Sequence, residues 1–380
     1  MILKTLSLTN FKNIAQTSLN FSPNINGLLG RNGMGKSNLL DAIYFLSLCK
    51  SFSGLTDEQL IRNGEAFAML RGLYLRRGID EELTLGMAKG KRKQLRRGGK
   101  EYRRLSEHIG NFPVVLVAPR DMELIGGSSE ERRKFVDIII SQSDPVYLDR
   151  LIRYAALVQQ RNRLLRDKAD NPDLYASIEL PLAAAADYIT RSRARMIERF
   201  RPIFAKLYRE ISGTDETPSI SYSSKMNDTG LPLEHLLAES RPKDLILGHT
   251  TVGPHRDDIL LTLDGMPAKT TASQGQSKTF TIAMRLSQYE FLHEAAGMKP
   301  LLLLDDIFDK LDASRVANIV DIVSRDMFGQ IFITDTNRDH LDSIMSRSAV
   351  DYRLWEVADG HFSELKSRGV GEVGSNSSAL

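Results

Sequence analysis

The sequence contains very little cysteine, since Cys49 is the only one among its 380 residues. A single cysteine cannot form a disulfide within the chain, and such usage suits a reducing compartment. Free cysteine packs as a small apolar residue, so we expect Cys49 in the hydrophobic core.

Long apolar runs are also missing. The longest, such as the four leucines at 301–304, fall far short of the roughly 20 residues that cross a bilayer. The N-terminal stretch MILKTLSLTNFKN lacks the apolar segment of a secretory signal. We therefore expect a cytoplasmic globular protein, and a composition of 42% hydrophobic and 26% charged residues allows one large core or two modest ones.

The chain lacks a large excess of charge of one sign, because 51 Lys and Arg face 48 Asp and Glu, a net charge of +3. Placement rather than total charge then decides whether a nucleic-acid surface exists. Residues 89–104 hold nine Lys or Arg against one Glu, around the turn signal Gly98-Gly99. This pattern predicts a basic hairpin that either contacts DNA phosphates or is simply solvated. The candidate DNA contacts are Lys91, Arg92, Lys93, Arg96 and Arg97.

A glycine-rich loop, GRNGMGKS at residues 30–37, fits the phosphate-binding pattern G-x-x-x-x-G-K-S. Apolar residues before it predict a strand, and residues 39–46 show helical spacing after it. Glycines let successive N–H groups turn toward an anion, and the helix start adds a favourable dipole. We expect Lys36 to reach the β- and γ-phosphates of ATP and Ser37 to bind Mg²⁺. The predicted nucleotide-binding residues here are Gly30, Arg31, Asn32, Gly33, Met34, Gly35, Lys36, Ser37 and Asn38.

A second motif, LLLLDDIFDKLD, places two carboxylates directly after a run of four leucines. The run predicts a strand buried on both faces, which would end at the crevice where such sheets bind ligands. Asp305 is expected to hold Mg²⁺, and Asp306 to orient or deprotonate the attacking water. With Lys36, these are the predicted catalytic residues.

A third motif, ASQGQSKTF at residues 272–280, precedes a helical series. Ser273 and Gly275 would lie at a helix N-terminus, where free N–H groups favour a phosphate. Taken alone, the segment could equally be a loop with a helix cap.

Between residues 130 and 243 the strand signals disappear and helical patterns take over. One series runs from Leu148 to Val158 along one face, and a second from Ile189 to Leu207, interrupted or kinked at Pro181 and Pro202. The two could pair antiparallel. Strand patterns occur on either side, at residues 112–117 and 259–263.

The order of the motifs resembles that of ATP-binding cassette ATPases: a P-loop, a helical insertion, SQGQ, a strand ending Asp-Asp, and a Leu-Asp pair. Within that superfamily the sequence is similar to the chromosome-maintenance and repair branch and, more closely, to the RecF family, from Ile2 to about Trp355. The motifs that carry this resemblance are LTNFKNI at 8–14, SSEERRKFVD at 128–137, QQRNRLL at 159–165, GPHRDD at 253–258 and ASQGQ at 272–276, with Asn32 and Asn38 around the P-loop.

The resemblance implies an α/β fold, a P-loop cassette-type ATPase head with an inserted α-helical domain that forms a short antiparallel arm. It places the head at 1–128 and 244–365 and the insertion at 129–243. The Gly- and Ser-rich composition of the last residues predicts a disordered tail at 366–380. The resemblance also implies an ATP-dependent homodimer in which Ser273, Gly275 and Gln276 of one copy close over ATP held by the other, with residues 309–312 at the interface. It further implies DNA, RecO and RecR as partners, and roles in recombination, repair, replication and the SOS response.

Two segments depart from the cassette pattern. Where a glutamine usually contacts Mg²⁺, residues 117–121 read VAPRD, so the metal role of that loop is uncertain. After the next strand, IFITDTNRD offers Thr334, Asp335 and Thr336 in place of a switch histidine, with His340 further along. We therefore expect slow hydrolysis.

Two other function classes compete, a transporter ATPase subunit and a small-molecule kinase or GTPase. The first is weakened by the long segment between Ser37 and Ser273, and the second because it needs no SQGQ segment. Two smaller features also have alternatives. His255, Asp257 and Asp258 are too closely spaced to favour a metal site. Arginines 161, 163, 166, 191, 193 and 195 either face water on helices or contact DNA.

Overall fold

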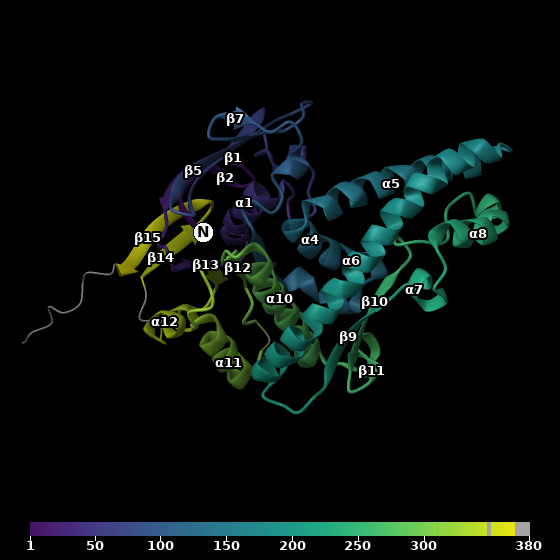
Figure 1. Ribbon diagram of the computed structural model, residues 1–380. Coiled ribbons are helices and arrows are strands. Elements are labelled where there is room, and N and C mark those ends of the chain that lie inside the picture. Colours follow the sequence, from purple (N-terminus) through teal and green to yellow (C-terminus); the bar gives the residue numbers. More distant parts are fainter. Residues whose placement is uncertain (310, 348–350, 369–380) are drawn as a thin grey trace, which may run out of the picture. The chain divides into compact units, whose positions relative to one another are not determined.

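The computed structural model describes residues 1–309, 311–347 and 351–368 (Figure 1). The chain forms two compact units: the first contains residues up to Asp121 and from Tyr289 onward, and the second is Met122–Gln288. The insertion predicted at 129–243 lies wholly in the second unit, which also contains residues 244–288. Of the predicted tail, residues 366–368 belong to strand β15, and 369–380 lie outside the described residues.

The first unit contains a mainly parallel sheet in the order β15-β14-β3-β13-β12-β8, in which only the β14–β15 pair is antiparallel. Because β3, β13 and β12 are parallel neighbours, their carboxyl ends meet at one edge of the sheet. The run 301–304 is completely buried, which confirms the predicted strand. The strands are β3 (Ile25–Leu29), β8 (Val114–Val117), β12 (Leu301–Asp305), β13 (Ile331–Asp335), β14 (Tyr352–Ala358) and β15 (His361–Arg368).

A second, antiparallel sheet of this unit has the order β2-β1-β4-β5-β6-β7. The basic hairpin predicted from residues 89–104 is confirmed: β6 pairs with β7 through Gly98 and Gly99, both at positive φ (54° and 79°). The strands are β1 (Ile2–Phe11), β2 (Ile14–Asn20), β4 (Phe67–Arg76), β5 (Ile79–Ala88), β6 (Gln94–Arg97) and β7 (Lys100–Glu101).

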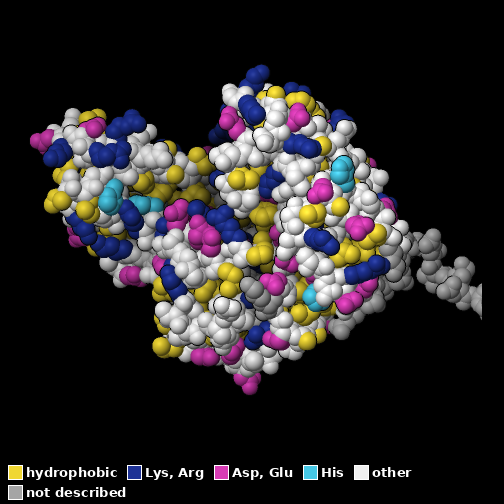
Figure 2. Space-filling model, turned by 180° about the vertical axis from the view of Figure 1, so that it is seen from behind, with side chains coloured by type: hydrophobic (Ala, Val, Ile, Leu, Met, Phe, Trp, Pro, Cys, Tyr) yellow, Lys and Arg dark blue, Asp and Glu magenta, His cyan; other side chains and the backbone are white. Residues whose placement is uncertain are grey.

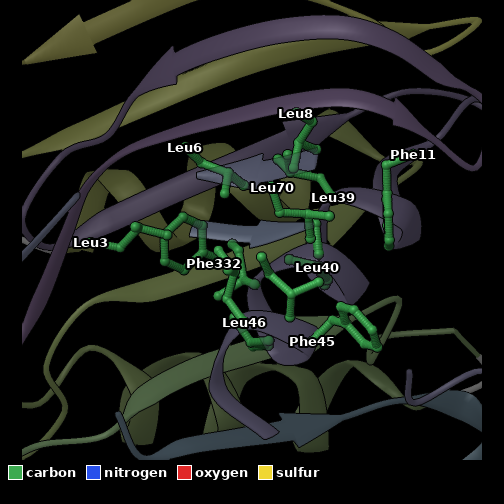
Figure 3. Close-up of a cluster of buried hydrophobic side chains, with 14 of the residues drawn as sticks. Leu3, Leu6, Leu8, Phe11, Leu39, Leu40, Phe45, Leu46, Leu70 and Phe332 are labelled. Carbon is green, nitrogen blue, oxygen red and sulfur yellow. The ribbon is translucent and has the colours of Figure 1, made fainter. Parts of the chain in front are cut away.

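Helix α1 (Lys36–Leu48) packs against strands of both sheets and forms the centre of the core. Figure 3 shows leucines of β1 and β4 facing Leu39, Leu40 and Leu46 of this helix. Cys49 belongs to the same cluster and is 4% exposed, as expected. Short elements and outer helices complete the unit: α2 (Asp57–Leu60), η1 (Leu105–Glu107), α11 (Ala313–Val323) and α12 (Arg338–Arg347).

The second unit is built around two long helices, α5 (Pro145–Arg166) and α6 (Pro172–Ser212), which pair along their length as predicted (Figure 1). Of the two predicted alternatives, interruption is wrong, because α6 continues through Pro181 and Pro202; a kink at either proline stays a prediction. Each internal proline costs about 3 kcal/mol, and the continuous buried face of α6 offsets it. The other helices of this unit are α3 (Glu123–Gly126), α4 (Ser129–Ser143), α7 (Lys225–Thr229), α8 (Leu233–Leu247) and α9 (Ala268–Thr271). Helix α10 (Gln274–Ala296) and the short helix η2 (Pro119–Met122) each contain residues of both units.

A small sheet, β11-β10-β9, also belongs to this unit. Its strands are β9 (Pro218–Ser223), β10 (Asp258–Leu263) and β11 (Met266–Pro267). The strand predicted at 259–263 is therefore confirmed. However, β9 lies in the stretch where we expected only helices, so that expectation was wrong there. Its sequence PSISYS does alternate polar and apolar residues, and this short signal was overlooked among the helical patterns around it.

The buried face of α5 differs from the predicted one. We expected the apolar residues between Leu148 and Val158 to face the core, but Ile152 is 52% exposed. The buried residues are Tyr147, Tyr154, Arg161 and Leu165. Two arginines are thus completely enclosed, Arg161 at 0% and Arg193 of α6 at 2% exposure. Both predicted roles, a solvated face or a DNA contact, are wrong for these two, whereas arginines 163, 166, 191 and 195 are exposed.

Carboxylates compensate both arginines: those of Glu179 and Asp244 are buried, and that of Asp137 is 17% exposed. Arg193 donates to both oxygens of Asp137 (3.0 Å each) and to the carbonyl of Pro254 (2.7 Å). Arg161 donates to Glu179 (2.8 Å) and to Asp244 (2.7 Å). Charged groups are buried only when paired. Arg193 thereby joins the motif SSEERRKFVD, which contains Asp137, to GPHRDD, which contains Pro254, while Arg161 joins α5 to α6 and α8.

Replacing Arg193 with alanine should lower the free energy of unfolding by about 3–5 kcal/mol, because it leaves the Asp137 carboxylate without its buried partner. The matched control is Arg163→Ala on α5, which should change stability by less than about 0.5 kcal/mol because Arg163 is exposed. Urea denaturation followed by circular dichroism measures both. Equal stability of the two variants would contradict the structural role of Arg193.

Candidate functional site

The glycine-rich loop connects β3 to α1, as the sequence predicts. Gly35 has φ +113°, and a Cβ there would lie 2.9 Å from the side-chain oxygen of Asn13. A Cβ on Gly30 would lie 2.4 Å from the carbonyl oxygen of Val357. Only glycine fits at these two positions, so the loop is closely fitted to its neighbours.

A side chain from the β1–β2 turn supports this loop. The Asn13 amide donates to the Met34 carbonyl (3.2 Å) and accepts from the amide of Asn38 (2.7 Å). The Gly360 backbone N–H also donates to Met34 (2.8 Å). Asn13 belongs to the motif LTNFKNI, which carries no local signal that would place this residue at the site. Its proximity to the glycine-rich loop depends on how β1 and β2 pack beside that loop, and a local sequence pattern does not contain this information.

Lys36 is 5% exposed, and its ammonium donates to the carbonyls of Gly30 (2.5 Å) and Arg31 (3.0 Å). Burial lowers the pKa of Lys36, while the nearby carboxylates of Asp306, Asp305 and Asp335 raise it. The cation is therefore held across the mouth of the loop, where the predicted phosphates would bind.

Asp305 lies at the carboxyl end of β12 and is 5% exposed. One of its oxygens accepts from the hydroxyls of Ser37 and Thr334, both at 2.8 Å. Burial raises the pKa of Asp305 and is opposed by these two hydrogen bonds, whereas the charge of Asp306 raises it further. The fold thus joins two predicted metal ligands that are far apart in the sequence.

The donor set fits a magnesium ion. Adjacent ligands of an octahedral Mg²⁺ at about 2.1 Å lie about 3 Å apart, and the oxygens of Ser37 and Asp305 are 2.8 Å apart. Mg²⁺ needs only one or two carboxylates when substrate phosphates complete its shell. The described residues contain no cluster of three or more His, Cys, Asp or Glu able to hold a metal.

Asp306 follows in a left-handed backbone conformation, with φ +49°. Its N–H donates to the hydroxyl of Thr334 (3.0 Å). A non-glycine residue there costs roughly 1–2 kcal/mol, and such strain is typical of active sites. The conformation agrees with the catalytic role predicted for Asp306, which stays a prediction.

His340 lies at the edge of the sheet where β12 and β13 end. Its Nδ1 hydrogen-bonds to Asp335 (2.8 Å) at the end of β13, and its ring packs edge-on against Phe308, with centroids 5.2 Å apart. In the sequence, His340 follows the end of β13 by five residues. Helix α12 places it beside Asp335, at the carboxyl end of that strand.

The VAPRD segment uses its carboxylate internally, because Asp121 accepts from the N–H of Ala118 (2.8 Å) and is 8% exposed. Whether residues 117–121 contact Mg²⁺, as the glutamine loop of other cassette ATPases does, is therefore not settled by this hydrogen bond. Asp312, in the segment expected at a dimer interface, caps α11 by accepting from the N–H of Arg315 (2.9 Å); residue 310 lies outside the described residues.

The SQGQ segment does begin a helix. Ser273 and Gln276 form a reciprocal cap at the start of α10, with hydrogen bonds of 2.7 and 3.2 Å. The amide of Gln276 also donates to Glu216 (2.7 Å). The nucleotide contacts of Ser273, Gly275 and Gln276 remain predictions.

The basic hairpin is only partly available to a ligand. Lys93 donates to Asp57 (2.8 Å), and Arg97 to Glu81 (2.6 Å). Arg96 lies 4.0 Å from Glu101. Lys91 and Arg92 are exposed, and no ion pair involves them among the described residues. Of the five candidate DNA contacts, these two are the freest.

His255, Asp257 and Asp258 have three different partners. His255 Nδ1 hydrogen-bonds to Tyr154 (2.6 Å), Asp257 accepts from Tyr222, and Asp258 accepts from Arg132 (2.9 Å). Burial lowers the pKa of His255 to about 4, so its ring is neutral at pH 7. The three side chains serve the packing of the second unit.

Comparison with known proteins shows similarity over nearly the whole chain. The RecF/RecN/SMC N terminal domain family matches residues 2–353. The chain is 48% identical over 361 residues to the DNA replication and repair protein RecF of Porphyromonas gingivalis, covering 95% of this chain and 99% of the relative. It is 47% identical over 372 residues to RecF of Bacteroides fragilis, covering 97% and 100%.

Solved structures agree. The structure of the recombination mediator protein RecF-ATP in the RecFOR pathway has a TM-score of 0.86 at 30% identity, covering 96% of this chain and 98% of that one. The Smc head domain of Pyrococcus furiosus has a TM-score of 0.56 at 16% identity, covering 97% and 96%, which shows the fold alone. The predicted family resemblance and α/β cassette-type fold are confirmed.

Asp306→Asn should bind ATP but hydrolyse it at least about 100-fold more slowly, because it removes the group predicted to handle the attacking water. Filter binding and phosphate release measure the two steps separately. The control is Asp321→Asn, which removes an exposed carboxylate on α11 and should leave both steps unchanged. Normal hydrolysis by Asp306→Asn would exclude it as a catalytic residue.

Proposed function

The chain belongs to the RecF family of DNA replication and repair proteins, and from that membership we propose that it is a DNA-binding ATPase of recombinational repair and replication restart. The observation that carries the proposal is the assembly of the P-loop with Ser37 and Asp305 at one sheet edge, in a chain nearly half identical to RecF. Neither a transporter subunit nor a small-molecule kinase accounts for this similarity.

ATP would bind on the loop of residues 30–38. Lys36 would hold the β- and γ-phosphates, and Ser37 with Asp305 would hold Mg²⁺, which neutralises developing phosphate charge. Asp306 would orient the attacking water. These roles are supported by the hydrogen bonds of Ser37 and Lys36 and by the strained backbone of Asp306.

Two copies would form one composite site, with Ser273, Gly275 and Gln276 of one copy acting on ATP bound to the other. The reciprocal cap of Ser273 and Gln276 supports this, because it fixes the start of the helix. The cap uses the backbone N–H groups of Ser273 and Gln276 themselves, so a phosphate would bind the N–H groups of Gln274 and Gly275 between them. ATP binding would join the copies, and slow, DNA-stimulated hydrolysis would release them.

The relative described as a recombination mediator in the RecFOR pathway suggests the partners RecO and RecR for this chain as well. The protein would bind double-stranded DNA or junctions of single and double strands in the cytoplasm, and help to load recombinase on gapped DNA. No helix among the described residues is long and apolar enough to cross a membrane.

Two surfaces could carry the DNA. One is the basic hairpin with Lys91 and Arg92. The other is the arm formed by α5 and α6, where exposed arginines include Arg163, Arg166 and Arg195. Figure 2 shows Lys and Arg side chains gathered on the lobe that this arm forms. Both would act through phosphates, so affinity should depend strongly on salt and weakly on sequence.

ATP should shift the protein from monomer to dimer and increase its affinity for DNA. Sedimentation measures the first effect, and gel shifts with single-stranded, double-stranded and gapped DNA measure the second, each with and without ATP. Lys36→Met is the control, since it removes the phosphate contact. If the wild-type protein bound no DNA under any of these conditions, the proposed function would be wrong.

Mixing two inactive variants should restore hydrolysis. Ser273→Arg and Lys36→Met disable different halves of the composite site, so each mixed dimer should contain one intact site. Phosphate release is measured over a range of mixing ratios, with circular dichroism to show that both variants fold. Mixed dimers that form without any recovery would argue against action between copies.

A further inference from the structure

A pocket of about 120 Å³ lies on the basic hairpin of the first unit. A cavity needs only ~15 Å³ to hold one water, so this pocket could hold a much larger group. Its lining includes six residues that define its chemistry: Arg92, Lys93, Glu101, Tyr102, Arg103 and Leu105.

The pocket favours an anion. Three cationic side chains line it against the single carboxylate of Glu101, which lies 4.0 Å from Arg96 outside the lining. Lys93 is paired with Asp57 (2.8 Å), so Arg92 and Arg103 are the two cations left for an anion. Arg92 and Arg103 are exposed, and neither has an ion-pair or hydrogen-bond partner among the described residues. Two planar guanidinium groups without partners match the geometry of a phosphate.

The rest of the lining is aromatic and apolar. Tyr102 and Leu105 are half-buried. The Tyr102 ring is braced edge-on by His108, with centroids 5.1 Å apart. A phosphate alone gains nothing from such a surface, whereas a nucleotide offers a phosphate and a flat base together.

The lining is also attached to the helix that begins at the P-loop. Lys93 donates to the carbonyl of Cys49 (2.7 Å), the residue that caps α1, and its ammonium lies 4.9 Å from the Phe45 ring centre. His108, which braces Tyr102, hydrogen-bonds to the carbonyl of Leu46 (2.7 Å). Two lines of contact therefore join the pocket to the C-terminal end of α1.

We propose that this pocket holds one unpaired nucleotide of a DNA strand, and that its occupancy is linked through α1 to the ATP site. The phosphate binds Arg92 and Arg103, and the base packs against Tyr102. A nucleotide within a duplex is stacked and would first have to be extruded, whereas an unpaired one enters at lower cost. The inference rests on the proposed DNA-binding function and adds a site and a ligand to it.

The link works in both directions, since a ligand that changes the affinity of a second site is itself affected equally by that site. DNA with unpaired nucleotides should therefore change the affinity of the protein for ATP, and ATP should change its affinity for that DNA. Blunt duplex should have a smaller effect, because it cannot fill the pocket.

The test compares Arg92→Ala/Arg103→Ala with a control of equal charge, Lys91→Ala/Lys100→Ala, whose residues lie on the same hairpin outside the lining. Fluorescence anisotropy measures binding of a blunt duplex and of the same duplex with a single-stranded extension. The pocket variant should lose about tenfold in affinity for the extended DNA beyond the loss shown by the control. For blunt duplex, the two variants should behave alike.

Tyr102→Phe should bind the extended DNA normally, and Tyr102→Leu should not, because only the aromatic face supports the base. In the wild type, the extended DNA should shift ATP affinity, and in Arg92→Ala/Arg103→Ala it should not. Free deoxythymidine monophosphate should compete only weakly. Displacement of DNA by it at similar concentration would make a free nucleotide the occupant and overturn the proposal.

Two failures can be told apart. If the wild type binds no DNA, the proposed function is wrong and the pocket proposal falls with it. If the wild type binds DNA but the pocket variant and the charge-matched control lose affinity equally for both DNAs, only the pocket proposal is wrong. In that case the hairpin would act through its total charge.

Discussion

One carboxylate oxygen of Asp305 accepts hydrogen bonds from Ser37 and Thr334, and this contact ties together the end of β12, the end of β13 and the start of α1. The contact depends on the parallel order of β3, β13 and β12, which brings their carboxyl ends to the same edge. Burial works against the charge on Asp305, and the two hydroxyls offset it. A site arranged in this way is prepared for a cation, because a divalent ion would stabilise the charged form that burial disfavours.

In the second unit, two buried arginines stabilise the packing of a mostly helical fold. Arg193 binds Asp137 and the Pro254 carbonyl, and Arg161 binds Glu179 and Asp244. Apolar packing alone would hold α5 and α6 together in several registers, whereas a buried ion pair is satisfied in only one. Two of the motifs that carry the family resemblance, SSEERRKFVD and GPHRDD, are thus joined through Arg193.

Local patterns in the sequence predicted the strand, loop and helix around Lys36, the buried strand before Asp305 and the basic hairpin, because each is a continuous segment with its own signal. The roles of Asn13 and His340 were not predictable in this way, since both depend on contacts between distant segments. Arg161 and Arg193 were misjudged for a related reason: arginine at helical spacing gives the same pattern whether a carboxylate or water faces it. The exposed Ile152 shows the reverse case, in which an apolar residue lies outside the core.

The strand that leads into the P-loop, β3, lies between β13 and β14, and the Met34 carbonyl is bound by both Asn13 and Gly360. A ribosome delivers the chain from its N-terminus, so the glycine-rich loop emerges early while both neighbours of its strand are still unmade. Until they arrive, β3 has two unpaired edges and the loop lacks one of its supports. A nascent chain therefore cannot present a finished phosphate cradle before nearly all of it has been synthesised, and products of interrupted translation should be unable to sequester ATP.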